Sequence, residues 1–195
     1  MSKRIALLSA AAFGALALTA AVIAPATAED KKMMKSEMSG EKTVMVGGAA
    51  MFPSKNIIQN AVNSKDHTTL VAAVKAAGLV DTLEGKGPFT VFAPTNAAFG
   101  KLPAGTVDTL VKPENKPALT KILTYHVVPR RLDASSLADG KKLKTVEGEE
   151  LTVKKAGDKV MIVDAKGGSS TVTISNVNQS NGVIHVVDTV LMPAS

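Results

Sequence analysis

The sequence contains no cysteine and no tryptophan, and aromatic residues make up only 3% of its 195 positions. Without cysteine, the chain can form neither a disulfide bond nor a lipid attachment through a thiol at its N-terminus. The fold must therefore be stabilised by packing alone. Tyr125 is the only tyrosine. Beyond residue 28, every aromatic residue except Phe52 lies between residues 89 and 125.

Basic and acidic residues are also nearly balanced. Lysine and arginine total 23 and the acidic residues 17, so the formal net charge is +6. Such a modest charge, spread along the whole chain, does not point to nucleic acid as a partner.

A long apolar run occurs only at the N-terminus. Ser2-Lys3-Arg4 precedes the apolar stretch Ile5 to Ala24, and Ala26-Thr27-Ala28 has the small-x-small pattern of a cleavage site. We interpret residues 1–28 as a signal peptide and expect an exported protein, either periplasmic or secreted. The alternative is an uncleaved anchor, because the run nearly spans a bilayer. After cleavage no integral membrane segment is expected.

Residues 29–51 are predicted to be a flexible polar spacer rich in methionine and lysine, because so little apolar surface cannot offset the entropy of ordering. Thioether sulfur is a ligand suited to Cu(I), so the methionines of this segment admit a copper-binding alternative. Their irregular spacing and the lack of a nearby histidine favour an unstructured tail. We expect no metal site and no cofactor.

Residues 52–195 are predicted to form one domain, in which helical patterns precede β patterns. A helix is expected from Asn56, and a second is expected with Asp66 or Thr68 as its cap and Gly78 as its end, followed by a turn at Leu79-Val80. A later helix, opened by Pro117, carries apolar residues at i, i+3 and i+4 and ends near His126.

The last third of the chain is predicted to be β structure. Short β-branched runs separated by glycine-containing turns indicate four strands, at 143–146, 151–153, 160–163 and 171–174. The final run, Val183 to Met192, is apolar on both faces, which is typical of a central strand, and Pro193 is expected to end it.

The densest group of aromatic residues lies in FTVFAPTNAAFGKLP, residues 89–103. We predict a buried strand from Phe89 to Phe92, a break at Pro94 and a short helix from Thr95 that is closed by Pro103. Thr95 is expected to cap this helix and Asn96 to bond to neighbouring loop backbone.

This stretch resembles the first signature box of the fasciclin-like domain family, and Gly182 to Pro193 is similar to the second box. Residues 123–128, LTYHVV, resemble the Tyr-His segment of that family, and residues 69–83 resemble its opening helix. The layout is that of an exported bacterial single-domain member. The resemblance implies an α+β fold: a fasciclin-type β-wedge of about seven strands with helices packed on one side and the two boxes paired.

The resemblance also implies adhesion to a protein or a surface glycan of matrix, envelope or host, without catalysis. Its candidate binding residues are Tyr125, His126, Val127 and Val128, which we call the Tyr-His segment. A purely structural role for Tyr125 and His126 is the alternative. The residues of the family motif that we expect to be structural are Phe89, Phe92, Pro94, Thr95, Asn96, Phe99, Leu102, Pro103, Gly182, His185 and Asp188.

The residues themselves also point away from an enzyme. His185 and Asp188 are three apart in a predicted strand, so their side chains should face opposite sides. Neither a Gly-x-Ser-x-Gly elbow nor a His-Glu-x-x-His zinc pattern is present. We therefore expect a monomeric binding module. The alternative is a carrier of a small apolar ligand, lipid-like or pigment-like, between helices and sheet.

Overall fold

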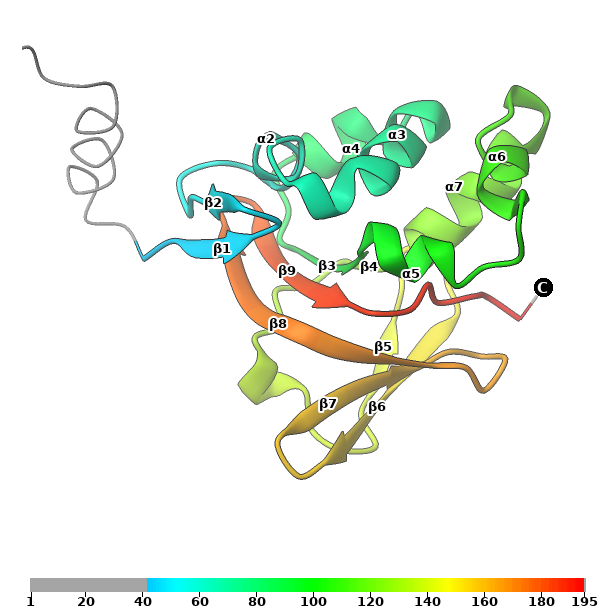
Figure 1. Ribbon diagram of the computed structural model, residues 1–195. Helices are drawn as coiled ribbons and strands as arrows, with labels where there is room; N and C mark the ends of the chain where they lie inside the picture. Colours follow the sequence, from blue (N-terminus) through cyan, green and yellow to red (C-terminus); the bar gives the residue numbers. More distant parts are fainter. Residues whose placement is uncertain (1–41, 195) are drawn as a thin grey trace, which may run out of the picture. The chain divides into compact units, whose positions relative to one another are not determined.

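The computed structural model describes residues 42–194 (Figure 1). The predicted signal peptide and residues 29–41 of the predicted spacer lie outside the described residues. The α-helices are α2 (Ile57–Ala61), α3 (Thr68–Ala77), α4 (Val80–Glu84), α5 (Asn96–Gly100), α6 (Thr106–Leu110) and α7 (Lys116–Tyr125). The strands are β1 (Val44–Val46), β2 (Ala49–Met51), β3 (Phe89–Pro94), β4 (Val127–Val128), β5 (Lys142–Lys144), β6 (Glu150–Ala156), β7 (Lys159–Val163), β8 (Ser169–Gln179) and β9 (Gly182–Val187).

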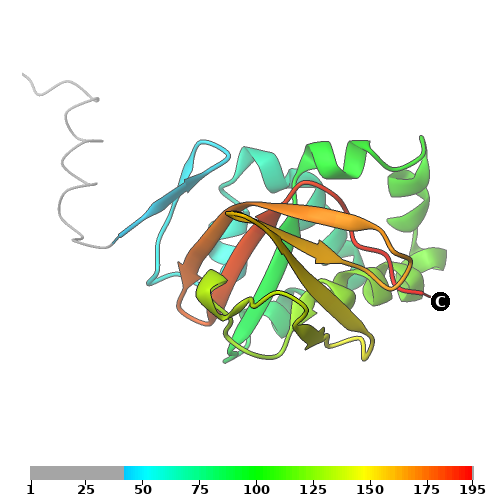
Figure 2. The same ribbon diagram turned by 90° about the horizontal axis from the view of Figure 1, so that it is seen from below.

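Seven strands form one strongly curved sheet in the order β4-β3-β9-β8-β7-β6-β5. Strands β3 and β9 are parallel, whereas the other neighbours are antiparallel. The two edges come together where the Val146 N–H donates to the Val127 carbonyl at 2.8 Å. The helices lie on one side of the sheet (Figure 1), and Figure 2 shows the curvature from below. The predicted α+β wedge of seven strands and the pairing of the two boxes are confirmed.

The central position of β9 follows from its two apolar faces, because each face packs into a different core. Ile184 and Val186 face the helices, whereas Val187 and, beyond the strand, Leu191 face the inside of the curved sheet. The helix-side core contains these helix-facing residues together with Val46, Met51, Ile57, Leu70, Val74, Val91, Phe99, Leu119, Leu123 and Val177, among others. The barrel-side core consists of Phe92, Tyr125, Val128, Leu132, Leu137, Leu143, Leu151, Val153, Ile162, Val187 and Leu191.

The spacer boundary expected at residue 51 is wrong, because residues 44–51 form the hairpin β1–β2. Val46 and Met51 are each only 3% exposed and belong to the helix-side core. Gly47 and Gly48 both have positive φ angles, 57° and 74°, which suits a tight hairpin turn. Strands of only three residues show too little alternation of apolar and polar side chains to be recognised. The sequence alone therefore indicates the end of a linker at Gly47-Gly48.

Two other local expectations are corrected in the helical region. Neither Asp66 nor Thr68 caps α3, because His67 occupies the N-cap position and makes no capping hydrogen bond with its side chain. The turn expected at Leu79-Val80 is helix α4, whose buried Leu83 donates its N–H to the Leu79 carbonyl at 3.0 Å. The predicted stop is confirmed, since Gly78 has the left-handed φ of 73°.

The two boxes also differ from their predicted boundaries. Strand β3 runs through Pro94, because proline at the end of a strand leaves the ladder intact, and the next N–H, that of Thr95, bonds to the Val187 carbonyl at 3.3 Å. Helix α5 ends at Gly100, before Pro103. Strand β9 ends at Val187 instead of Pro193, because the Asp188 carboxylate accepts the Thr171 N–H at 2.8 Å. None of the helices in residues 42–194 combines the length and apolarity needed to cross a bilayer.

Candidate functional site

The first box anchors the fold through its polar residues. The Thr95 hydroxyl accepts the Ala98 N–H at 3.2 Å, so the predicted cap of α5 is confirmed. The Asn96 side-chain oxygen accepts the Thr69 N–H at 3.0 Å, and its amide donates to the Lys65 carbonyl at 2.8 Å. Asn96 therefore ties α5 to the start of α3.

In the second box His185 is completely buried and stacks on Phe92, with ring centroids 5.7 Å apart. Its Nδ1 accepts the Asn176 N–H at 3.4 Å, which leaves Nε2 to donate to the Leu132 carbonyl at 2.8 Å. Burial lowers the pKa of His185, against the opposing effects of the Leu132 carbonyl and Asp133. The ring is therefore neutral and serves as a hydrogen-bonded part of the core.

Asp188 has different partners and does not form a dyad with His185. Its carboxylate accepts hydrogen bonds from the Thr171 N–H at 2.8 Å and the Thr189 hydroxyl at 3.0 Å, and Lys101 lies 3.6 Å away. Burial alone would raise the pKa of Asp188, but these hydrogen bonds and the Lys101 charge hold that pKa below its ordinary value. The carboxylate therefore stays ionised and holds the end of β9 against β8.

All four side chains of the Tyr-His segment are buried: Tyr125 is 0% exposed and Val127, the most exposed of them, is 5%. The Tyr125 hydroxyl accepts the Ala165 N–H at 2.9 Å and donates to the Glu150 carbonyl at 3.3 Å. Burial raises the pKa of Tyr125, although the bond from Ala165 acts against this. This tyrosine links the end of α7 to β6 and to the loop after β7.

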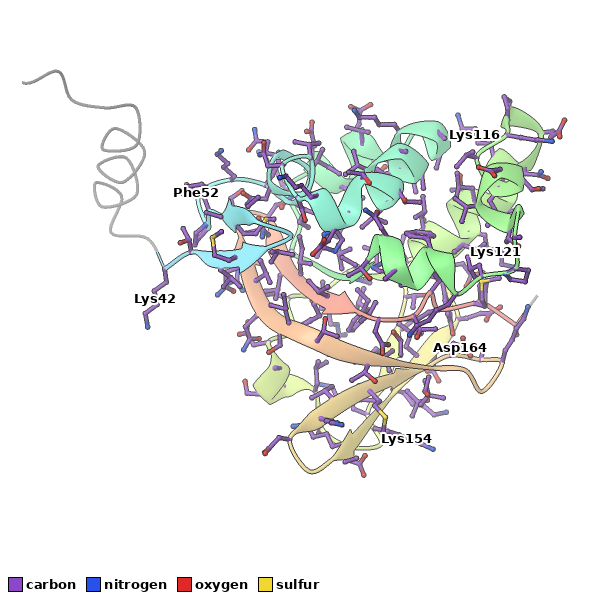
Figure 3. All side chains as sticks on the ribbon, in the orientation of Figure 1. Lys42, Phe52, Lys116, Lys121, Lys154 and Asp164 are labelled. Carbon is purple, nitrogen blue, oxygen red and sulfur yellow. The ribbon has the colours of Figure 1, made fainter. Side chains whose placement is uncertain are left out.

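His126 forms the C-cap of α7 and bonds through both ring nitrogens. Nε2 accepts the Leu191 N–H at 3.0 Å, so Nδ1 carries the proton and donates to the Ile122 carbonyl at 2.8 Å. Burial lowers the pKa of His126 to about 4, while the Ile122 carbonyl and Asp164 work in the opposite direction. Asp164, labelled in Figure 3, in turn accepts the Met192 N–H at 3.0 Å. This bonding favours the structural role for His126.

The Tyr-His segment separates two hollows of the molecule. On the helix side lies a cavity of about 40 Å³, which we call the inner cavity, and His126 and Val127 form part of its wall. On the other side Val128 lines an open cleft of about 480 Å³ between the sheet edges β4 and β5, which we call the outer cleft.

The outer cleft has an apolar floor and a basic rim. Val128, Leu132 and Leu143 are buried beneath it, while Val146 is 41% exposed. The basic side chains that line the cleft are Arg130, Lys141, Lys142 and Lys144.

A single carboxylate, Glu150, lies among these cations and pairs with Lys142 at 3.3 Å. Lys141 donates to the Ser136 carbonyl at 2.7 Å. Within residues 42–194, Arg130 and Lys144 have no acidic partner within 4.0 Å. The cleft is thus able to bind an acidic partner that also offers an apolar group.

The residues of the outer cleft other than Val128 were not predicted from the sequence. A signal exists at residues 142–146, KLKTV, where basic and apolar residues alternate. Such alternation indicates a strand with one exposed basic face, but it does not show that this strand lies at a sheet edge opposite β4. In the part of the chain that is described, no three histidine or acidic side chains gather in a way that could hold a metal ion.

Comparison with known proteins gives relatives over most of the chain. The model of the fasciclin domain matches residues 65–193. Protein sll1483 of Synechocystis is 48% identical over 78% of this chain and 82% of its own length. The immunogenic protein MPB70 of Mycobacterium bovis is 36% identical over 99% of this chain and 98% of its own. The cell surface glycolipoprotein MPB83 of the same species is 40% identical over 76% of this chain and 64% of its own.

The fold is also found in a solved structure, that of a FAS1 domain pair from the insect cell adhesion molecule fasciclin I. The TM-score is 0.64 at 18% identity, over 72% of this chain and 52% of the other, so this chain spans about half of that domain pair. The structural similarity shows that the two proteins share a fold, and the sequence matches show that this chain is related to fasciclin-domain proteins. The chain belongs to the fasciclin domain family.

Proposed function

We propose that this protein is an exported, non-catalytic binding module that attaches to another protein through the outer cleft. The observation that carries the proposal is the cleft itself, about 480 Å³ in volume, with a half-exposed Val146 above an apolar floor and a basic rim. We infer that the partner offers an extended acidic segment.

The chemistry of the cleft supports a peptide segment as the ligand. Strand β5 ends the sheet order at the cleft, and an edge strand can accept an added strand by main-chain hydrogen bonding. The two carbonyls of β4 already accept the N–H groups of Val146 and Arg130. Carboxylates on one face of such a strand would meet Arg130 and Lys144, while apolar side chains on its other face would lie over the apolar floor at Leu143. Lysine on an edge strand also discourages pairing between identical chains, which is consistent with a monomer.

Export and adhesion are supported by the relatives and by the N-terminal sequence. MPB83 is named a cell surface protein, and fasciclin I is named a cell adhesion molecule. Residues 1–28 have the pattern of a signal peptide. We propose that the mature protein works at the cell envelope or outside the cell, with residues 29–41 as a tether and the Tyr-His segment as the support beneath the cleft.

The test is a titration with a synthetic peptide in which Glu and Val alternate. Wild-type protein should bind it saturably, and a double variant with Arg130→Glu and Lys144→Glu should bind at least about tenfold more weakly, since charged hydrogen bonds contribute roughly 1.5–3 kcal/mol each. Binding should also weaken with added salt.

The matched control reverses two exposed lysines on the helix side that do not line the outer cleft, Lys65 before α3 and Lys75 on α3. It changes the net charge equally and should leave the affinity unaltered. An equal loss in both double variants would mean that net charge alone attracts the peptide. Tighter binding of a sulfated glycan than of the peptide would assign the cleft to a surface glycan instead.

The second candidate function, carriage of a small apolar ligand, is favoured by one observation, the inner cavity between helices and sheet. A volume of about 40 Å³ is well below the ~150 Å³ that holds a benzene molecule. It therefore supports a much smaller molecule than a lipid or a pigment.

A further inference from the structure

One buried polar atom in the helix-side core has no hydrogen-bonding partner. His67 ends the short 3-10 helix Lys65–His67, just before α3, and only 3% of it is exposed. Its Nδ1 lies 2.9 Å from the Ser64 hydroxyl, but within residues 42–194 its Nε2 has no partner. Leaving such a buried atom unpaired is destabilising.

The surroundings do little to stabilise a charge on this ring. Burial lowers the pKa of His67, against smaller opposite effects from the Ala93 carbonyl and Asp66. The Ala93 carbonyl is near enough to act on the ring, yet it lies outside hydrogen-bonding geometry with Nε2. At neutral pH the ring is therefore uncharged and offers one hydrogen-bonding position.

His67 forms part of the wall of the inner cavity, and the rest of that wall is nearly all apolar. Met51, Leu70, Val177 and Ile184 contribute to it from the hairpin, α3, β8 and β9. The other polar side chain in the wall is His126, whose two nitrogens are already bonded. The cavity thus has apolar walls and one unused polar atom.

A water molecule matches this cavity poorly. Buried waters make about three hydrogen bonds, with two to four polar partners, whereas this wall offers His67 Nε2 as its one unpaired side-chain atom and, beside it, the Ala93 carbonyl. A volume of about 40 Å³ has room for roughly three groups the size of water, each of which needs about 10–15 Å³. A better match has one polar group at Nε2 and carbon atoms elsewhere.

We propose that the inner cavity is a binding site for a small uncharged amphipathic molecule, with one hydroxyl group on a compact apolar body of a few heavy atoms. The hydroxyl bonds to His67 Nε2, and the apolar body lies against Met51 and Ile184. This site is separate from the outer cleft, and it does not depend on a protein partner.

The hairpin β1–β2 closes the site next to His67. Gly47 approaches the Ser64 hydroxyl so closely that a Cβ at residue 47 would clash with it. The Lys65 N–H also donates to the Gly47 carbonyl at 3.2 Å. Because Ser64 holds the ring of His67 and Met51 lies on the same hairpin, the hairpin fixes both the polar and the apolar side of the cavity.

The experiment uses ethanol as the hydroxyl probe and xenon as an apolar probe of similar bulk, with the imidazole nitrogens of His67 observed by NMR. Ethanol should shift the Nε2 resonance saturably, whereas xenon should perturb the methyl signals of Ile184 and Val177 with a much smaller shift at Nε2. In His67→Phe, ethanol affinity should fall by about fivefold, equivalent to one net hydrogen bond, while xenon affinity is retained.

The matched control is His185→Phe, which removes a buried histidine on the other side of the sheet and should leave ethanol binding unchanged. Should His67→Phe fail to fold, Val177→Ile serves in its place, because it fills the cavity and should weaken both probes. A linear, non-saturating shift at Nε2, or equal ethanol affinity in wild type and His67→Phe, would overturn the proposal.

Discussion

The two cores of this domain share the same central strands but differ in how completely they are filled. The barrel-side core contains the largest fully buried side chains, Tyr125 and Phe92, and the Tyr125 hydroxyl is bonded on both sides. The helix-side core is built from aliphatic residues and Phe99, encloses the inner cavity and contains the unpaired Nε2 of His67.

The difference shows where this fold has room for a ligand. Hydrogen bonds from Tyr125 and His185 cross-link the barrel-side core, and closely packed interiors tolerate little change in volume, so we expect this core to act as a rigid support. The outer cleft lies over this rigid side, at the seam between β4 and β5, whereas the inner cavity lies in the looser side beneath the hairpin. Rigid support suits a docking surface, and spare volume suits a small ligand.

The largest effect is expected from Phe92→Ala in the barrel-side core. This ring is 0% exposed and stacks on His185, so its removal leaves a cavity and should cost about 3–5 kcal/mol in the free energy of unfolding. Urea denaturation measures the loss. A cost below about 2 kcal/mol would show that the barrel-side core adapts, and the contrast between the two cores would fail.

The next effect is a loss of stability in acid, carried by His126. Its pKa is about 4 in the fold and 6.5 when unfolded, so between these values only the unfolded chain takes up the proton. The contribution of neutral His126 to the free energy of unfolding is fully present above pH 6.5. It should fall by roughly 3 kcal/mol as the pH drops to about 4. The lowered pKa values of His67 and His185 act in the same direction.

Urea titrations at neutral pH and near pH 4.5 measure this loss. His126→Gln keeps a donor and an acceptor but does not titrate, and it should show a shallower dependence on pH. Equal stability at both pH values in the wild type would contradict the bonding described for His126.

A matched pair of substitutions compares the cores directly. Val153→Ile adds a methylene to the barrel-side core and should destabilise by about 1–3 kcal/mol through overpacking. Val177→Ile adds the same group beside the inner cavity and should stabilise by up to about 1 kcal/mol. Both valines lie in strands and are at most 1% exposed. Changes of the same sign and size would show that the two cores are equally filled.

The smallest effect concerns the first box, which borders both cores. Thr95→Ala removes the hydroxyl that accepts the Ala98 N–H and should cost about 1 kcal/mol. Thermal unfolding provides the readout, with Thr95→Ser as the control because it keeps the cap. An unchanged melting temperature in Thr95→Ala would mean that the cap contributes nothing.

Much of the fold could be predicted from the sequence because its signals are local. The alternation of Ile184, Val186 and Val187 places β9 between two cores, and the glycine at 78 ends α3 as expected. The hairpin β1–β2 could not be predicted, since its burial depends on residues far along the chain, such as Val177 and Ile184 in the wall of the same cavity.

The candidate site was predictable only in part, for a similar reason. The sequence places Tyr125 and His126 at a helix end, but their burial results from contacts with Glu150, Ala165 and Leu191. The outer cleft requires β4 and β5 to meet across the curved sheet, and the unpaired atom of His67 appears only when its neighbours are in place. Such long-range features leave no periodic pattern in the sequence.

The central claim, that the outer cleft is the binding surface, is tested most directly by hydrogen exchange with and without the Glu-Val peptide. Bound peptide should slow exchange at the amides of residues 142–146, Val128 and Arg130, and leave α3 and α4 unchanged. Protection confined to the helices, or no protection at β4 and β5 under saturating peptide, would contradict the claim.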